Sequence, residues 1–102
     1  MDLQRLLKEA QKMKNDLTRL EKELQETEYT GAAGGEGVKV VMNGNNQMIS
    51  IDINPDLLGA DDKEMLEDLI KIAVNEATKK AADDREDKMG GVTGGISMPG
   101  LF

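Results

Sequence analysis

Residues 2–28 read DLQRLLKEAQKMKNDLTRLEKELQETE, and the spacing of their apolar side chains decides the fold. These side chains recur at alternating intervals of three and four residues, at Leu3, Leu6, Ala10, Met13, Leu17, Leu20 and Leu24. Such an a/d heptad pattern is typical of a helix that buries one narrow seam against another helix. We therefore predict one long helix over this range and call these seven residues the apolar seam.

Basic side chains follow the same predicted helix on the side away from the seam. We call the following five residues the basic stripe: Arg5, Lys8, Lys12, Arg19 and Lys22. Lys14 is a further basic residue, and the acidic g positions of the heptad are Glu9, Asp16 and Glu23. Mixed charge of this kind is common on solvated helices, so the stripe is either a solvent-exposed surface or a binding surface for an anion.

A small antiparallel sheet is predicted after residue 28. Residues 29–33 form a weak first strand, and the glycine-rich stretch 34–37 forms a turn. Asn43-Gly44 predicts a hairpin with a type I′ turn, in which both central residues have positive φ. The second strand should turn Val38, Val40 and Met42 to one face, and the third should turn Ile49, Ile51 and Ile53 inward.

A second helix is predicted from Asp61, which would form a capping box with Glu64, to Gly90 and Gly91. Its broad apolar stripe is wide enough to cover a sheet face or a dimer partner. The stripe residues that we assign to the core or a dimer interface are Leu66, Leu69, Ile70, Ala73, Val74 and Ala77. The chain is thus predicted to be an α+β protein of helix, three-stranded meander and helix, with one domain over residues 1–88 and a flexible glycine-rich tail over residues 89–102.

The predicted core is thin. The chain has 102 residues, one Phe, one Tyr and no Trp. A chain of this size buries only about 60–65% of its unfolded surface, so we expect a two-fold homodimer. The first helix, roughly 36 Å long at 1.5 Å per residue, exceeds the small sheet. Its C-terminal half should pack on the second helix, and its N-terminal half should project as an arm.

Composition favours a cytoplasmic protein that is not an enzyme. There is no cysteine, no signal-peptide pattern and no apolar run long enough to span a membrane. With neither His nor Cys, the commonest general base and the strongest nucleophile are missing. The paired carboxylates Asp61-Asp62 and Asp83-Asp84 are interpreted as a helix start and a polar helix face. We predict no catalytic site, metal site or cofactor.

The net charge of −7 disfavours a polyanionic partner, because phosphate binding requires a positive field. The distribution of charge points the other way. Residues 1–28 carry six basic and seven acidic side chains, whereas residues 29–102 carry seven and thirteen. The first helix is therefore far less acidic than the rest, and its positive charges gather on one face.

Several motifs follow the heptad helix of residues 6–24 along the chain. They are Gly35-Glu36-Gly37-Val38-Lys39-Val40 leading to Asn43-Gly44, Ile51-Asp52-Ile53-Asn54-Pro55, Met65-Leu66-Glu67-Asp68-Leu69-Ile70, Ala73-Val74-Asn75-Glu76-Ala77 with Lys79-Lys80, and Met98-Pro99-Gly100. With these motifs nearly the whole chain resembles the YbaB/EbfC family of nucleoid-associated proteins. The order and spacing of these motifs together are more specific than any one of them.

This resemblance implies a bacterial, cytoplasmic, tweezers-shaped α+β dimer. It also implies binding to double-stranded DNA with little sequence preference, through the helical arms, and a change in DNA conformation. The DNA-contact residues would then be the basic stripe and Lys14, with a possible second set at Lys79, Lys80, Arg85 and Lys88. The alternative hypothesis is a homodimeric adaptor whose apolar seam binds a partner helix and whose basic stripe serves only solubility.

Overall fold

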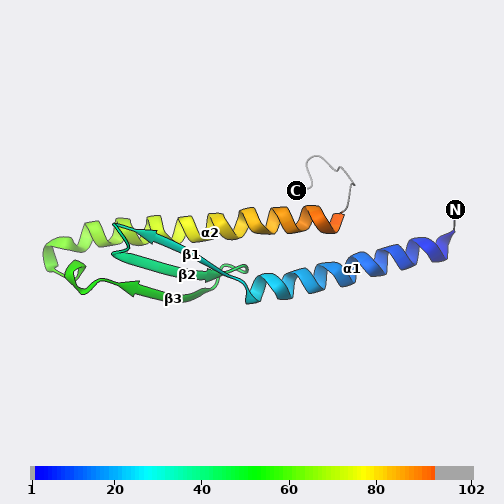
Figure 1. The fold of residues 1–102 in the computed structure, drawn as a ribbon, viewed down its shortest axis with the longest axis horizontal. Helices are drawn as coiled ribbons and strands as arrows, with labels where there is room; N and C mark the ends of the chain where they lie inside the picture. The colour runs from blue at the N-terminus through cyan, green and yellow to red at the C-terminus, as the bar shows by residue number, and fades with distance from the viewer. Residues whose placement is uncertain (1, 94–102) are drawn as a thin grey trace.

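The computed structural model describes residues 2–93 and confirms the predicted α+β order. Its elements are α1 (Leu3–Glu26), β1 (Glu28–Ala33), β2 (Val38–Asn43), β3 (Met48–Ile53), the short 3₁₀ helices η1 (Pro55–Leu57) and η2 (Ala60–Asp62), and α2 (Lys63–Thr93). The molecule is elongated, measuring 69 × 25 × 16 Å. The sheet lies near one end along α2, and α1 extends past the other end of α2 (Figure 1). No helix within residues 2–93 is long and apolar enough to cross a membrane.

The three strands form an antiparallel sheet in the order β1-β2-β3. Gly31 of β1 pairs with Val40 of β2, and Val40 pairs with Ile51 of β3, so all three lie on the same face. The backbone of α2 approaches this face at Gly31, where an added Cβ would lie 1.9 Å from the Ala73 carbonyl oxygen. A glycine is therefore required for the close contact between strand and helix.

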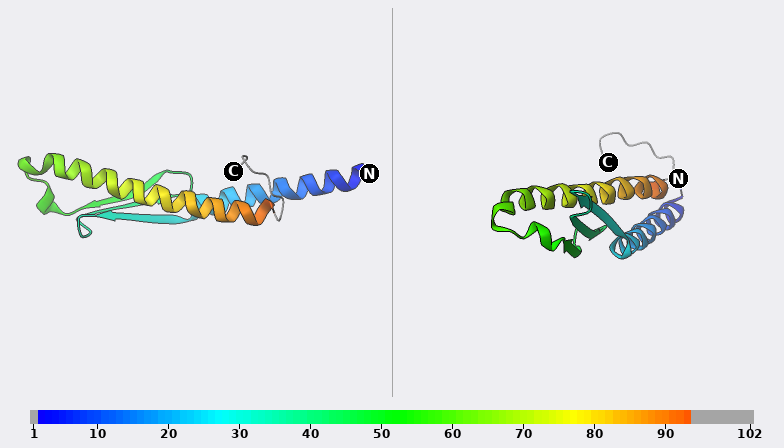
Figure 2. Two further views of the ribbon diagram at one scale, coloured as in Figure 1. Left: turned by 90° about the horizontal axis from the view of Figure 1, so that it is seen from above. Right: turned by 60° about the vertical axis from the view of Figure 1, so that its left-hand side comes forward.

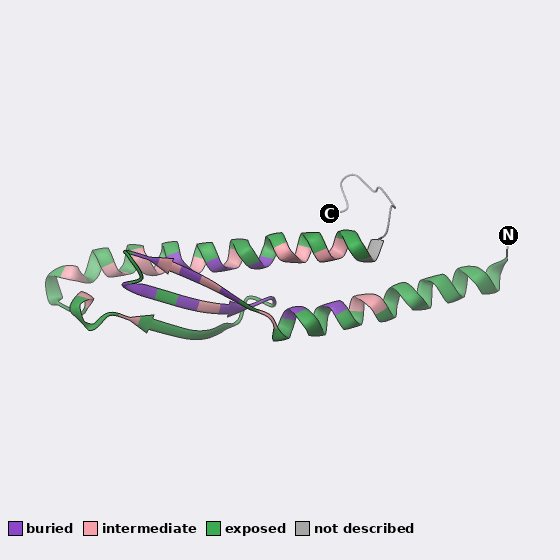
Figure 3. Cartoon of the chain, viewed as in Figure 1, coloured by how far each residue is buried: buried purple, intermediate pink, exposed green. Residues whose placement is uncertain are grey.

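The core lies between α2 and the two strands that it covers, β1 and β2 (Figure 3). Its buried residues are Ala33, Val38, Val40, Met42, Ala73 and Ala77. The partly buried residues Leu66, Leu69, Ile70 and Val74 pack against them. The predicted face of β2 is confirmed, and the six α2 residues assigned to the core or a dimer interface all contribute to this cluster within one chain.

The third strand corrects one prediction. Ile49 and Ile51 were expected to be buried, but their side chains are 52% and 43% exposed. Ile51 lies on the same sheet face as the buried Val40, yet α2 crosses β1 and β2 and leaves β3 uncovered. For Ile51 the predicted face is right and the predicted burial is wrong. Ile49 is also the extra residue of a β-bulge, because Val41 pairs with Ser50 while Met42 pairs with Met48.

The hairpin between β2 and β3 lies where predicted, but its turn type differs. Positive φ occurs at Asn46 and not at Gly44, which rules out a type I′ turn. Gly44 serves a different purpose, because its amide donates to the Leu24 carbonyl oxygen at 2.8 Å and an added Cβ would lie 2.4 Å from that oxygen. The buried Asn43 side chain accepts hydrogen bonds from the amides of Asn45 and Gln47. Glycine thus allows the hairpin to approach α1.

Both predicted ends of the second helix are wrong by a few residues. The Asp62 amide donates to the Gly59 carbonyl oxygen in a 3₁₀ turn, so Asp61 lies inside this turn and does not cap α2, which begins at Lys63. At the other end α2 continues through Gly90 and Gly91 to Thr93. Two glycines weaken a helix by about 1 kcal/mol each and need not end it. Residues 89–93, predicted as the start of a flexible tail over residues 89–102, therefore belong to α2, and residues 94–102 lie outside the described residues.

Candidate nucleic-acid interface

The N-terminal half of α1 projects from the body, as predicted (Figures 1 and 2). We call residues 3–16 the arm and residues 17–26 the base of α1. Asp2 is the N-cap residue of α1, and its side chain accepts a hydrogen bond from the Gln4 amide at 3.0 Å. Leu20 and Leu24 of the base are buried, whereas Leu3 and Leu6 of the arm are 68% and 45% exposed. Only the C-terminal part of the apolar seam is therefore covered within one chain.

The basic stripe forms one continuous surface along α1. At about 100° per residue its five members fall within a sector of roughly 100°, and at 1.5 Å per residue Arg5 and Lys22 lie about 26 Å apart along the axis. All five side chains are exposed. Because duplex DNA rises 3.4 Å per base pair, this length matches roughly seven to eight base pairs.

Most of the stripe is available to an external anion. Among the ion pairs within residues 2–93, none involves Lys8, Lys12 or Lys22. Arg5 pairs with Glu9 at 3.5 Å and Arg19 with Asp16 at 2.9 Å, and both arginine side chains are at least three-quarters exposed. Exposed pairs of this kind contribute about 0–1 kcal/mol, so they exchange readily for other partners.

Lys14 does not belong to the stripe. At about 100° per residue it lies roughly 135° from the centre of the stripe, on the flank of the apolar seam. It lines a shallow groove with Ala10, Met13, Leu17, Thr18 and Glu21. The Thr18 hydroxyl donates to the Lys14 carbonyl oxygen at 3.0 Å. A duplex lying on the stripe would therefore leave Lys14 aside.

The four basic candidates on α2 all have partners within the chain. Lys79 pairs with Asp83 at 3.0 Å, and Lys80 pairs with Glu76 at 3.3 Å and donates to the Thr30 carbonyl oxygen. Arg85 and Lys88 instead reach across to α1. Arg85 pairs with Glu21 at 2.7 Å, and Lys88 pairs with Glu23 at 3.5 Å. The latter two cations lie on the body at the base of α1, not on the projecting arm.

A hydrogen-bonded cluster joins β1 to α2 beside this base. The Tyr29 hydroxyl donates to Asp84, which also pairs with Lys88 at 3.0 Å. These two donors hold the pKa of Asp84 below its usual value. Burial, and then the hydrogen bond with Asp84, raises the pKa of Tyr29, while the bond to Asp84 raises that of Lys88. The cluster therefore keeps Asp84 and Lys88 charged and Tyr29 neutral around neutral pH.

The sequence did not point to Glu21, Tyr29 or Asp84 as residues that support the arm. Glu21 and Arg85 are separated by 64 residues, and Tyr29 and Asp84 by 55. No local spacing links them. Taken alone, Glu21 and Asp84 resemble ordinary exposed polar residues, and Tyr29 resembles an ordinary core residue. Their only signal is the predicted contact between the C-terminal half of the first helix and the second helix.

Charge divides the chain between arm and body. The arm, residues 3–16, carries four basic and two acidic side chains, a net charge of +2. All other residues together carry nine basic and eighteen acidic side chains, a net charge of −9. An elongated α+β protein with a cationic helical arm on an acidic body belongs to the class of proteins whose shape and charge suit an extended polyanion.

Comparison with known proteins gives this class a family. Residues 1–96 match the model of the YbaB/EbfC DNA-binding family, and the chain belongs to this family. It is 46% identical to a nucleoid-associated protein of Pelotomaculum thermopropionicum, covering 99% of this chain and 96% of that one. It is 43% identical to a nucleoid-associated protein of Clostridium novyi, covering 100% and 90%. The predicted family resemblance is confirmed.

A solved structure has the same fold. The crystal structure of an uncharacterized protein from Helicobacter pylori superposes with a TM-score of 0.83 at 28% identity. The match covers 92% of this chain and 99% of the other. The arrangement of one long helix, a small sheet and a second long helix is thus shared with an experimentally determined structure.

Proposed function

We propose that the chain binds double-stranded DNA with little sequence preference, through the basic stripe of α1, and alters the conformation of the DNA. The observation that carries this proposal is the concentration of exposed positive charge on a projecting helix. Lys8 and Lys12 are exposed on the arm, and the arm has a net charge of +2 beside a remainder of net −9. A duplex is attracted to the arm and repelled by the body.

The mechanism follows from phosphate neutralisation. Each stripe lies along the backbone of the duplex and releases condensed counterions as its cations approach the phosphates. If two copies together neutralise six to ten phosphates, the affinity falls by about three to five decades between 50 and 200 mM salt. Two arms on one dimer hold two segments of backbone at a fixed separation, which is how the complex would alter the conformation of the DNA.

Little on the stripe can distinguish one base from another. Direct readout uses side chains such as Asn, Gln or Arg on base edges in the major groove. Apart from Lys and Arg, this face offers Asn15, whose side-chain oxygen already accepts from the Gln11 amide group at 3.1 Å. Contacts to phosphates position a protein without reading sequence. Low sequence preference is therefore the expected behaviour.

The uncovered third strand supports a homodimer. Met48, Ile49 and Ile51 expose 46%, 52% and 43% of their surfaces along β3, the edge strand that α2 leaves uncovered. Exposed apolar edges of this kind are sites of association. A second copy covering β3 removes this surface from water and places two arms on one particle. Ile51→Glu should convert the dimer to a monomer in a mass measurement at micromolar concentration, and a monomeric wild-type protein would contradict the dimer.

The adaptor function is the second candidate, and the exposed seam of the arm favours it. Leu3, Leu6 and Met13 have the spacing of a helix that receives another helix, and they are 68%, 45% and 37% exposed. In this case a partner helix binds the seam and the stripe is dispensable. The two functions use different faces of the same arm, so surface variants separate them.

The test is salt-titrated binding to a random duplex by fluorescence anisotropy. The first variant combines Lys8→Glu, Lys12→Glu and Arg19→Glu on the stripe. The matched control combines Lys39→Glu, Lys63→Glu and Lys71→Glu on the body, with the same change in net charge. We expect the stripe variant to lose binding and the control to lose much less. Equal binding by the stripe variant, or no binding by the wild-type protein, would contradict the proposal.

The relatives named above are called nucleoid-associated proteins, and we extend to this chain a location in the cytoplasm at the nucleoid. The proposed role requires no chemical step. The lack of His and Cys in the sequence remains the reason to expect no enzymatic activity. Co-sedimentation of the protein with isolated nucleoids, at low and high salt, measures this location.

A further inference from the structure

The contact between α1 and the rest of the molecule is small for the length of helix that it supports. Of the seam, only Leu20 and Leu24 are buried. The Leu24 carbonyl oxygen accepts hydrogen bonds from the amides of Gly44 and Thr27 at 2.8 and 3.3 Å. The arm, residues 3–16, is about 20 Å long at 1.5 Å per residue. A small rotation of α1 at its base therefore displaces the N-terminal part of the basic stripe by a large distance.

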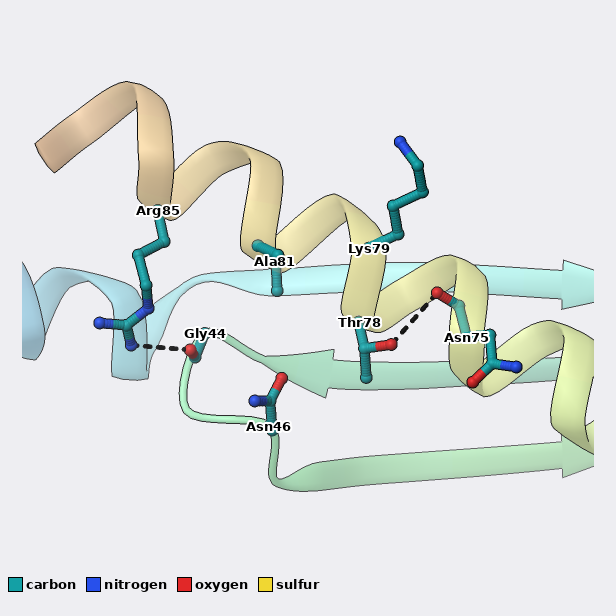
Figure 4. Close-up of a pocket in the computed structure, with 8 residues that line it drawn as sticks. Gly44, Asn46, Asn75, Thr78, Lys79, Ala81 and Arg85 are labelled. Carbon is teal, nitrogen blue, oxygen red and sulfur yellow. Dashed lines mark hydrogen bonds between the residues drawn. The ribbon is translucent and has the colours of Figure 1, made fainter. Parts of the chain in front are cut away.

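Arg85 joins three segments at this base, namely its own helix α2, the helix α1 and the β2–β3 hairpin. Its Nη1 lies 2.7 Å from Oε1 of Glu21 on α1. Its Nη2 donates to the Gly44 carbonyl oxygen at 3.1 Å and to Oδ1 of Asn45 at 3.3 Å, both in the β2–β3 hairpin. Figure 4 shows Arg85 on α2 reaching the hairpin at Gly44. A guanidinium donates in fixed directions from one plane, so it fixes the relative position of its partners.

A second ion pair restrains α1 from the opposite side. Two residues apart on a helix, Glu21 and Glu23 point about 160° away from each other around the axis. Glu23 pairs with Lys88 at 3.5 Å, and Lys88 is held in turn by Asp84 at 3.0 Å. The pairs Glu21–Arg85 and Glu23–Lys88 thus flank the buried contact of Leu20 and Leu24. A pair on each flank opposes rotation of α1 about its own axis.

We propose that Arg85 is a positioning residue, which sets the orientation of the arm and so turns the basic stripe away from the body. This inference rests on the proposed function for its consequence, because DNA binding would use the stripe that Arg85 orients. Arg85 acts through Glu21 and does not itself contact DNA. Its loss releases the arm, and the two stripes of a dimer no longer present a fixed surface to the duplex.

One substitution distinguishes positioning from DNA contact, because the two roles predict opposite changes in the affinity for DNA. Glu21→Gln removes a negative charge from α1 and breaks the ion pair with Arg85. If Arg85 contacted DNA, this change would raise the affinity, because it frees a cation and removes an anion. If Arg85 positions the arm, the affinity falls, by about two- to fivefold for an exposed pair of this kind. The matched control is Glu26→Gln, which removes the same charge from the same helix and should raise the affinity.

Arm orientation is measured without DNA, from residual dipolar couplings of backbone amides in α1 relative to those in α2. We expect Glu21→Gln and Arg85→Gln to reduce or reorient the couplings of residues 3–16, and Glu26→Gln to leave them unchanged. Glu21 is half exposed, with 51% of its side chain accessible, so its variant should fold like the wild-type protein. If the wild-type protein fails to bind DNA, the couplings alone decide the inference. Unchanged couplings, or a rise in affinity in Glu21→Gln equal to that in Glu26→Gln, would overturn it.

Discussion

The two halves of α1 have the same heptad and different environments. In the base, Leu20 and Leu24 are 5% and 0% exposed, and ion pairs to α2 flank them. In the arm, Leu3 and Leu6 of the same heptad are 68% and 45% exposed, and the helix has solvent around it (Figure 3). Heptad spacing determines which side of a helix is apolar, but the length of the neighbouring element determines how much of that side is buried.

This difference also separates stability from binding along one helix. Substitutions in the base should change the free energy of unfolding, because buried contacts are lost there. Substitutions in the arm should change binding, because the arm contributes little to the core of its own chain. The predictions below compare matched sites in the two halves, from the largest expected effect to the smallest.

Leu24→Ala should lower the free energy of unfolding by about 3 kcal/mol, because a fully buried side chain is truncated and leaves a cavity. The same truncation at the exposed Leu6 should cost less than about 0.5 kcal/mol. Urea unfolding at one protein concentration measures both. An equal loss at the two sites would mean that a partner, such as a second copy, buries the arm.

Gly44→Ala should cost about 2 kcal/mol, because its Cβ would overlap the Leu24 carbonyl oxygen and push the hairpin away from the base of α1. Gly35→Ala is the control. Its Cβ would have no neighbour within 4 Å, but its φ of +63° is unfavourable for alanine by about 1 kcal/mol. Thermal unfolding of both variants gives the comparison. A neutral Gly44→Ala would contradict the close approach of hairpin and helix.

The elements of this fold follow from local patterns, and the errors of prediction arise where distant segments meet. Alternation in residues 48–53 identifies the strand and its apolar face, but it cannot say whether α2 extends over that face. Asn43-Gly44 marks the hairpin, yet the glycine is needed for contact with Leu24, which lies twenty residues earlier. In both cases the deciding neighbour is outside the local window.

The candidate interface likewise contains residues that the sequence identifies and residues that only the fold identifies. The basic stripe is visible in the sequence because its residues share one helix, and their spacing alone places them on one face. From its charge alone, Arg85 is predicted to be one of the possible DNA contacts. Its partner Glu21 lies 64 residues away, so only the fold reveals that it joins α1 to α2. Charge patterns within one helix are therefore more informative than a list of basic residues.

The cluster at the base predicts a pH dependence of stability. Because the pKa of Asp84 is lowered in the folded protein, its contribution is present above the unfolded pKa and is lost as the pH falls through the folded value. The raised pKa values of Tyr29 and Lys88 have the opposite sign, so their contribution is lost as the pH rises through the folded values. Stability should therefore decline on both the acid and the alkaline side of neutral pH.

Asp84→Asn should lower the free energy of unfolding at pH 7 by about 1 kcal/mol and flatten the decline in acid. Asp83→Asn is the matched control, because Asp83 is an exposed neighbour paired only with Lys79 among the described ion pairs. Urea unfolding at pH 3, 7 and 10 measures the two variants. Parallel acid limbs for Asp84→Asn and the wild-type protein would contradict the assigned role of Asp84.

The smallest expected effect tests which face of the arm contacts DNA. Lys12→Gln and Lys14→Gln each remove one positive charge from the same turn of an exposed helix. If the duplex lies on the stripe, each lost phosphate contact at Lys12 lowers the slope of log K against log salt by about 0.9. Lys14 lies on the flank of the seam, so its slope should remain that of the wild-type protein, with only a slight loss of affinity from the general field. Equal slopes for the two variants would mean that the arm attracts DNA by its net charge and not by an oriented face, since a uniform field does not distinguish two lysines two residues apart.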